Sequence, residues 1–149
     1  YSLDTWNVHF AKVRAAPMKS VSWYRLLQQT DESRIDEVLD FAAKALPLDT
    51  IATGPDTHMG VGPGFEAHRA LDWLLQDLDR FPGRGWALIK AGLRSPVVRN
   101  RNMALKALLA WRREQWPQEA QELLRQAVLM EPNEDLRARI ETLAGPRPV

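Results

Sequence analysis

Four polar residues between positions 99 and 113 have a spacing that could form a binding site. Arg99, Lys106 and Arg113 are seven residues apart, and Asn102 lies between the first two. On an α-helix this spacing places the side chains on one face. Guanidinium and ammonium groups on a shared face bind carboxylates or phosphates, so one interpretation is a site for an anionic partner. The other is a solvated face that forms ion pairs with acidic residues of a neighbouring helix.

A second group of polar residues lies in and after a segment rich in glycine and proline. Asp56 and His58 belong to the run PLDTIATGPDTHMGVGPG at positions 47–64, and His68 follows it. Carboxylate and imidazole groups can hold a metal or move a proton. Their spacing matches no metal signature and the motif HExxH is absent, so we expect no metal here. The other interpretation is a compact loop, fixed by glycine and proline, over one edge of the fold.

The absence of cysteine narrows the chemistry further. With no cysteine among its 149 residues, the chain cannot supply a disulfide, a thiolate zinc site, an iron–sulfur cluster or a thiolate haem ligand. It contains no P-loop, nucleophile elbow or EF-hand motif. We therefore expect no cofactor and take a cytoplasmic location as the simplest interpretation. No stretch approaches the ~20 apolar residues of a membrane helix, so we expect no membrane partner.

Charge is segregated along the chain, although the net charge is only +1. Positions 80–113 carry nine basic residues and no acidic one. Positions 31–79 carry eleven acidic and three basic residues, and positions 114–149 carry seven acidic and four basic ones. A basic block is typical of nucleic-acid binding. Acidic segments on both sides would repel a long nucleic acid, which favours a protein partner or a short anionic group.

The six tryptophans are the other unusual feature of the composition. An exposed tryptophan beside arginine can stack on a nucleobase, and Trp111-Arg112-Arg113 is the segment that best fits this role. The interpretation that we favour is packing in the core or between helices, because Trp86 and Trp116 fall at predicted helix ends.

Helical periodicity and proline positions define the elements that hold these residues. Apolar residues at spacings of three and four predict amphipathic helices over 31–46 and 65–81. Ser95 and Pro96 suit the start of a further helix, and Gly145-Pro146 suits the end of the last one. No alternating pattern predicts a strand. The predicted helices are 3–15, 18–29, 31–46, 65–81, 84–94, 97–114, 118–130 and 133–144.

Two segments of the C-terminal half repeat at an offset of 36 residues. The unit is a helix, a proline-containing turn and a second helix, and its period is typical of helical solenoids. One such pair cannot bury its apolar face alone, so pairs must stack. We expect one α-helical repeat domain over 1–149, with N-terminal helices at 1–46, the loop at 47–64 and stacked helices at 65–144. The matching positions are Leu88/Leu124, Ala91/Ala127, Leu93/Leu129 and Pro96/Pro132, then Arg99/Arg137, Arg101/Arg139 and Leu105/Leu143 after a two-residue slip.

The repeat resembles the HEAT family, in which a short polar or proline turn leads into a second helix that begins with Val-Arg. Ser95-Pro96-Val97-Val98-Arg99 carries this pattern, and 131–137 carries a weaker version. The resemblance implies an all-α, right-handed α-α superhelix of stacked helix pairs, with the second helix of each pair on the concave surface. It would also give Arg99 and Arg137 structural roles in bonding neighbouring turns. Armadillo-like or irregular helical packing is the alternative.

A narrower resemblance is to bacterial helical-repeat proteins that are sometimes named limonene hydroxylase. It is carried by TGPDTHMGVGPGFEAH, DLDRFPGRGW and SPVVRNRNMALKALLAW. That name implies a monooxygenase, which needs haem, flavin or non-haem iron to handle oxygen. The sequence shows no thiolate, no GxGxxG after a strand and no facial-triad pattern, so its residues do not support the activity in the name.

These observations lead to one functional hypothesis and two alternatives. The hypothesis is a non-enzymatic binding or scaffold module whose binding surface comprises Arg99, Asn102, Lys106 and Arg113. The first alternative is an enzyme, either the hydroxylase implied by resemblance or another activity in the loop of Asp56, His58 and His68. The second is binding of an anion or a nucleic acid through the basic helix face.

Overall fold

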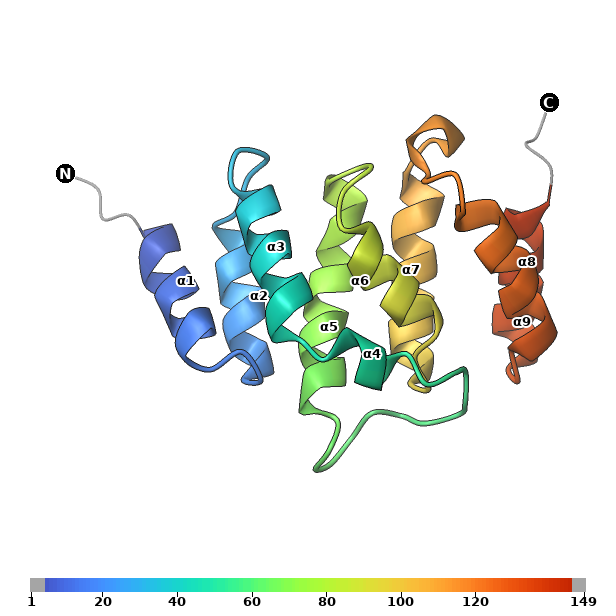
Figure 1. Cartoon of the computed structure of the whole chain (residues 1–149), viewed down its shortest axis with the longest axis horizontal. Helices are drawn as coiled ribbons and strands as arrows, with labels where there is room; N and C mark the ends of the chain where they lie inside the picture. Colours follow the sequence, from blue (N-terminus) through green and yellow to red (C-terminus); the bar gives the residue numbers. More distant parts are fainter. Residues whose placement is uncertain (1–4, 146–149) are drawn as a thin grey trace.

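The computed structural model describes residues 5–145, and the regular structure of this part is helical (Figure 1). Across these residues there is no strand, only an isolated parallel bridge between His58 and Val97. The expected all-α class, with at least six helices, is confirmed. None of the described helices is long and apolar enough to cross a membrane. The elements are α1 (Thr5–Ala15), α2 (Ser20–Gln28), α3 (Ile35–Ala45), α4 (Leu48–Ile51), α5 (Glu66–Asp77), the 3₁₀ turn η1 (Leu78–Arg80), α6 (Trp86–Leu93), α7 (Val98–Ala110), the 3₁₀ turn η2 (Arg113–Gln115), α8 (Ala120–Met130) and α9 (Glu134–Ala144).

The helices stand side by side in one row that runs from α1 to α9 (Figure 1). Along the back of this row α2 packs against α5, α5 against α7, and α7 against α9. In front of them lie α3, α4, α6 and α8 (Figure 1). Successive helices also pair directly, α1 with α2, α6 with α7, and α8 with α9. The chain therefore forms a row of helices whose last two pairs each have one helix in front, α6 or α8, and one behind, α7 or α9.

Two predicted apolar stripes form the centre of the core. The first stripe has five apolar residues in and just after α3, from Ile35 to Leu46, and all five are buried. The leucines of α5 are buried as well. Each buried aliphatic side chain of this size contributes about 1.5–3 kcal/mol to folding. Close approach of α6 to α5 requires a glycine, because a Cβ on Gly92 would lie 2.7 Å from Leu75 Cδ1. The hydrophobic periodicity of the sequence therefore identified the faces that pack.

The tryptophans serve packing in most positions. Trp6, Trp23 and Trp111 are buried. The indole of Trp111 donates a hydrogen bond of 2.8 Å to the carbonyl oxygen of Leu78, and that of Trp23 donates one of 2.7 Å to Pro17. Trp111 is therefore unable to stack on a nucleobase, and the alternative that placed such a contact at 111–113 is wrong for this side chain.

Several helix boundaries differ from the predicted ones. The helix predicted over 97–114 ends at Ala110, because Trp111 turns into extended backbone to reach the core. The helix predicted over 31–46 begins only at Ile35, since Asp31 caps a turn by accepting a hydrogen bond from the backbone N–H of Ser33. A hydrogen bond from the Ser33 hydroxyl and, to a lesser extent, the one from its backbone N–H lower the pKa of Asp31. These local hydrogen bonds compete with the helix, as short polar side chains commonly do.

The segment at 47–64 runs along the lower ends of α6 and α7 (Figure 1). It begins with one helical turn, α4, where an irregular backbone was expected throughout. Gly54 N–H then donates to Arg94 O at 2.8 Å, His58 N–H donates to Pro96 O at 3.2 Å, and Val98 N–H donates to His58 O at 3.0 Å. The loop is thus fixed to the turn between α6 and α7, which places its side chains next to those of α7.

The last helix pair, α8 and α9, is joined to α7 by a buried ion pair. Arg101 Nε and Glu131 Oε1 are 2.6 Å apart, and a second hydrogen bond of 2.7 Å makes the contact bidentate. Arg101 Nη1 also donates to Ser95 O at 2.9 Å. Arg101 therefore bonds the neighbouring turns, a role that the HEAT resemblance would give to Arg99.

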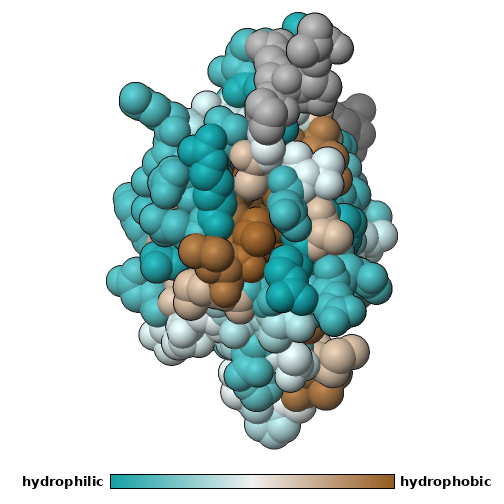
Figure 2. Space-filling view, turned by 90° about the vertical axis from the view of Figure 1, so that its right-hand side faces the viewer, coloured by the Kyte–Doolittle hydropathy of each residue, from teal (hydrophilic) through white to brown (hydrophobic). Residues whose placement is uncertain are grey.

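The repeat positions differ most at the end of the row. Leu93 is 5% exposed, whereas its equivalent Leu129 is 87% exposed. The reason is that α8 stands next to Leu93 in the row, where both line one cavity, whereas no described helix pair stands beyond α8 and α9. Figure 2 shows this end of the molecule, where apolar side chains lie in a hollow between hydrophilic flanks. The same residue type at an equivalent position is therefore core in one pair and surface in the next.

Candidate binding groove

A groove opens between α7 and α9, and it contains three of the four residues predicted for the binding surface. Its cationic members come from both helices, Arg99 and Lys106 from α7 and Arg139 from α9. We call it the basic groove. Its lining residues are Met59, Val98, Arg99, Asn102, Met103, Lys106 and Arg139.

Two cations of the basic groove form ion pairs with acidic residues of α5 and η1. Arg99 Nε lies 2.5 Å from Asp72 Oδ2, and Lys106 Nζ lies 3.2 Å from Asp79 Oδ2. The pairing with a neighbouring acidic helix that the sequence offered as an alternative is therefore present. The side chains of Arg99 and Lys106 nevertheless remain 59% and 48% exposed. The Lys106–Asp79 pair is the more exposed of the two, and exposed ion pairs contribute only about 0.2–1 kcal/mol, so an incoming anion can share or replace this contact. The Arg99–Asp72 pair has a buried carboxylate, so an anion there would share Arg99 rather than displace Asp72.

Asp72 is the buried member of this network. Its Oδ2 accepts from Arg99 and, at 3.2 Å, from Gln76 Nε2, while Oδ1 is buried without a partner among the described residues. Its position one turn after His68 on α5 places it under Arg99. Asp72 thereby fixes the direction of the Arg99 side chain toward the basic groove.

Arg113, the fourth predicted residue, does not belong to the basic groove. It lies in η2, beyond the end of α7, and its guanidinium carbon is 4.3 Å from the centroid of the Trp116 ring. Its Nη1 donates to Gly145 O at 3.3 Å. The seven-residue spacing failed here because α7 ends three residues earlier, at Ala110.

Sequence reasoning missed the apolar groove residues of α7, Val98 and Met103, and both residues that come from other segments, Arg139 and Met59. Arg139 approaches from α9, where its Nη2 donates to the side-chain oxygen of Asn102. The only sequence signal for it was its alignment with Arg101 in the repeat, which pointed to a shared structural role instead. Met59 comes from the loop, and no pattern within the loop indicated that it would face α7.

No family model, curated protein or solved structure matches the chain. A function for the basic groove must therefore be argued from its geometry. The basic groove offers two guanidinium groups, one ammonium group and an amide beside the thioethers of Met59 and Met103. Such a set binds carboxylate or phosphate oxygens by charge-assisted hydrogen bonds. Methionine side chains adapt to varied apolar groups next to the anion.

The loop candidates lie together but do not converge on a common point. His58 Nε2 is 3.6 Å from Asp56 Oδ2, and the rings of His58 and His68 both contact Phe65. Burial, and to a lesser extent the charges of His58 and Arg69, lower the pKa of His68. Across residues 5–145 no three histidine or carboxylate side chains are grouped as metal ligands would be. The arrangement is an aromatic stack that closes the loop.

Proposed function

We propose that this chain is a non-enzymatic binding module whose basic groove receives a short anionic group of a protein partner. The observation that carries the proposal is the meeting of Arg99 and Lys106 with Arg139, from a second helix, in one exposed groove. Three cations face two carboxylates, Asp72 and Asp79, which leaves one positive charge for a ligand. We also propose that the helix pairs stack as HEAT-type repeats, which present such grooves between successive second helices.

The mixed lining of the basic groove supports a side chain or chain end of a protein. Met59 and Met103 offer apolar surface in the same groove as the charges. An acidic residue flanked by apolar residues would contact both kinds of surface. A bare phosphate would use only the cations, and a long nucleic acid would meet the acidic residues of α5.

The test compares two variants that remove the same charge. The triple variant Arg99→Gln/Lys106→Gln/Arg139→Gln neutralises the basic groove without adding repulsion to Asp72 and Asp79. The control neutralises three exposed cations of other helices, Lys12, Arg25 and Lys44. Proteins cross-linked to the wild-type chain in extracts of its host should be retained by the control and lost from the groove variant. Equal retention by both variants would refute the proposal.

Two further measurements separate the alternatives. Titration with labelled DNA and RNA at low and rising salt tests nucleic-acid binding, which should weaken with a slope of about one per contacted phosphate. We expect no binding at low salt. An absorption spectrum and elemental analysis of the purified protein test the enzyme alternative, since stoichiometric iron, haem or flavin would favour an oxygenase over a binding module.

A further inference from the structure

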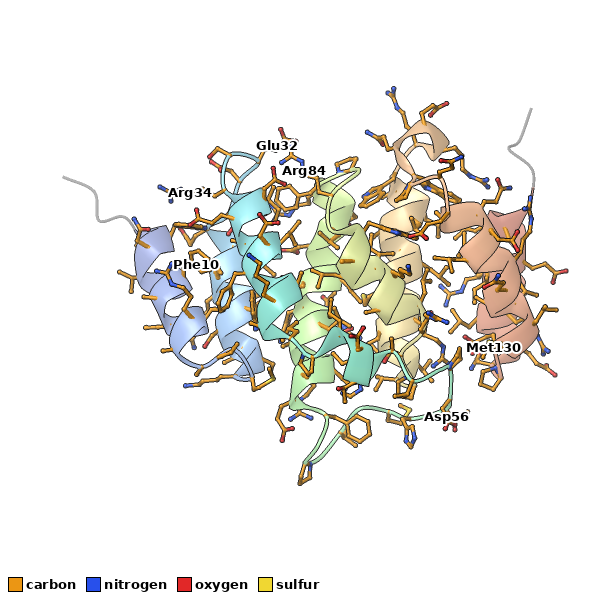
Figure 3. All side chains as sticks on the ribbon, viewed as in Figure 1. Phe10, Glu32, Arg34, Asp56, Arg84 and Met130 are labelled. Atoms are coloured by element: carbon orange, nitrogen blue, oxygen red, sulfur yellow. The ribbon has the colours of Figure 1, made fainter. Side chains whose placement is uncertain are left out.

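A small cavity lies at the front of the molecule, between α6 and α8, where the last two helix pairs meet. One wall is the backbone that follows α4, and the cavity has a volume of about 140 Å³. Met130, at the end of α8, lies on the same lower side of the molecule as the loop that carries Asp56 (Figure 3). The wall is fixed, because Gly54 N–H donates a hydrogen bond of 2.8 Å to Arg94 O.

The cavity has an apolar floor and a cationic mouth. Leu93 is buried, and Leu123 and Ala127 are half-buried. Arg94 and Lys90 also line it, and Arg94 is exposed. The two cations are four residues apart on one face of α6. An occupant would therefore place its apolar part against the leucines and a polar end at the arginine.

Of the two cations at the mouth of the cavity, one is paired within the protein, so the mouth favours a ligand with one negative charge. Lys90 Nζ lies 3.4 Å from Glu119 Oε1. A hydrogen bond from Trp86 Nε1, and to a lesser extent Lys90, lower the pKa of Glu119, which keeps its carboxylate charged. The Arg94 side chain makes no ion pair or hydrogen bond with the described residues, and none of the described lining residues is acidic. One guanidinium group is thus available to an anion.

The size of the cavity sets the size of the occupant. An apolar cavity of about 150 Å³ holds a benzene ring. We propose that this cavity binds a small monocarboxylic acid whose apolar part has the size of a benzene ring, with its carboxylate on Arg94. The site is independent of the basic groove, because none of its lining residues belongs to that groove.

Benzoate and its neutral isostere benzamide are the probes for this site. Each is titrated into the ¹⁵N-labelled full chain while the amide signals of Leu93 and Ala127 are followed by NMR. Benzoate should shift both signals saturably and bind more tightly than benzamide. Arg94→Gln should weaken benzoate binding about fivefold, the upper range for a partly exposed ion pair, and leave benzamide binding unchanged.

Two further variants make the test decisive. Arg125→Gln removes an exposed cation of α8 outside the cavity and should leave benzoate affinity unchanged. Ala127→Met extends a side chain into the cavity and should abolish binding of both probes. The proposal is overturned if neither signal shifts with benzoate, if benzamide binds as tightly as benzoate, or if Arg94→Gln has no effect.

Discussion

The buried ion pair between Arg101 and Glu131 gives a direct test of how the last helix pair, α8 and α9, is held. Neither side chain exposes more than 1% of its surface. Their other polar atoms are also bonded, Arg101 Nη1 to Ser95 O and Glu131 Oε2 to Asn133 N–H. Glu131→Ala would leave a buried guanidinium group without its counter-charge. We expect the free energy of unfolding to fall by about 3–5 kcal/mol, the usual cost of breaking a buried pair from one side.

Urea denaturation followed by circular dichroism measures this change. The matched control is Glu122→Ala, which breaks an exposed ion pair of 3.3 Å with Arg125 on α8 and should cost about 0–1 kcal/mol. The double variant Arg101→Met/Glu131→Leu should recover most of the loss, because apolar residues of similar volume often replace a buried pair at little cost. A loss for Glu131→Ala no larger than that of the control would refute this account of the attachment.

Two other predictions concern pH and the repeat. Burial lowers the pKa of His68 from 6.5, so the unfolded chain binds the proton more tightly than the folded one. The urea midpoint should therefore decrease as pH falls below 6.5 toward the lowered pKa. This decrease should be smaller in His68→Gln. An equal decrease of the midpoint with pH in both proteins would contradict the prediction. At the equivalent repeat positions, Leu93→Ala should cost about 2–5 kcal/mol and Leu129→Ala about 0.5 kcal/mol or less. Equal losses in urea denaturation would contradict burial of Leu93 by α8.

The sequence was sufficient for the class of fold and for the faces that pack. Apolar spacing identified the buried stripes of α3 and α5, because helix periodicity alone decides which side chains share a face. Boundaries were less predictable, since they depend on contacts made across the fold. Trp111 illustrates this point, because its burial and its hydrogen bond to Leu78 O end α7 at Ala110. Nothing in the local sequence distinguishes an end at Ala110 from an end one turn later.

The same limit applied to the candidate site. Arg99, Asn102 and Lys106 were found together because they lie on one helix. Arg139 and Met59 come from segments about 40 residues away on either side. Their position beside α7 depends on how α9 and the loop pack against that helix, and the periodicity of the sequence does not predict this packing. Helical spacing therefore identified the polar residues contributed by one helix and missed the residues contributed by its neighbours.

The charges around the basic groove decide what kind of anion it can hold. Asp72 and Asp79 lie within 3.2 Å of Arg99 and Lys106, so the positive potential of the groove is local. Beyond a screening length of about 8 Å at physiological salt, a ligand meets near-neutral surface. A single carboxylate can still displace the more exposed pair, Lys106–Asp79, and gain the contact with Arg139. A polyanion gains little more than its first group, because the next contacts along α5 are with carboxylates. On the proposed function, the acidic residues that neutralise most of the groove therefore favour short anionic groups over polyanions.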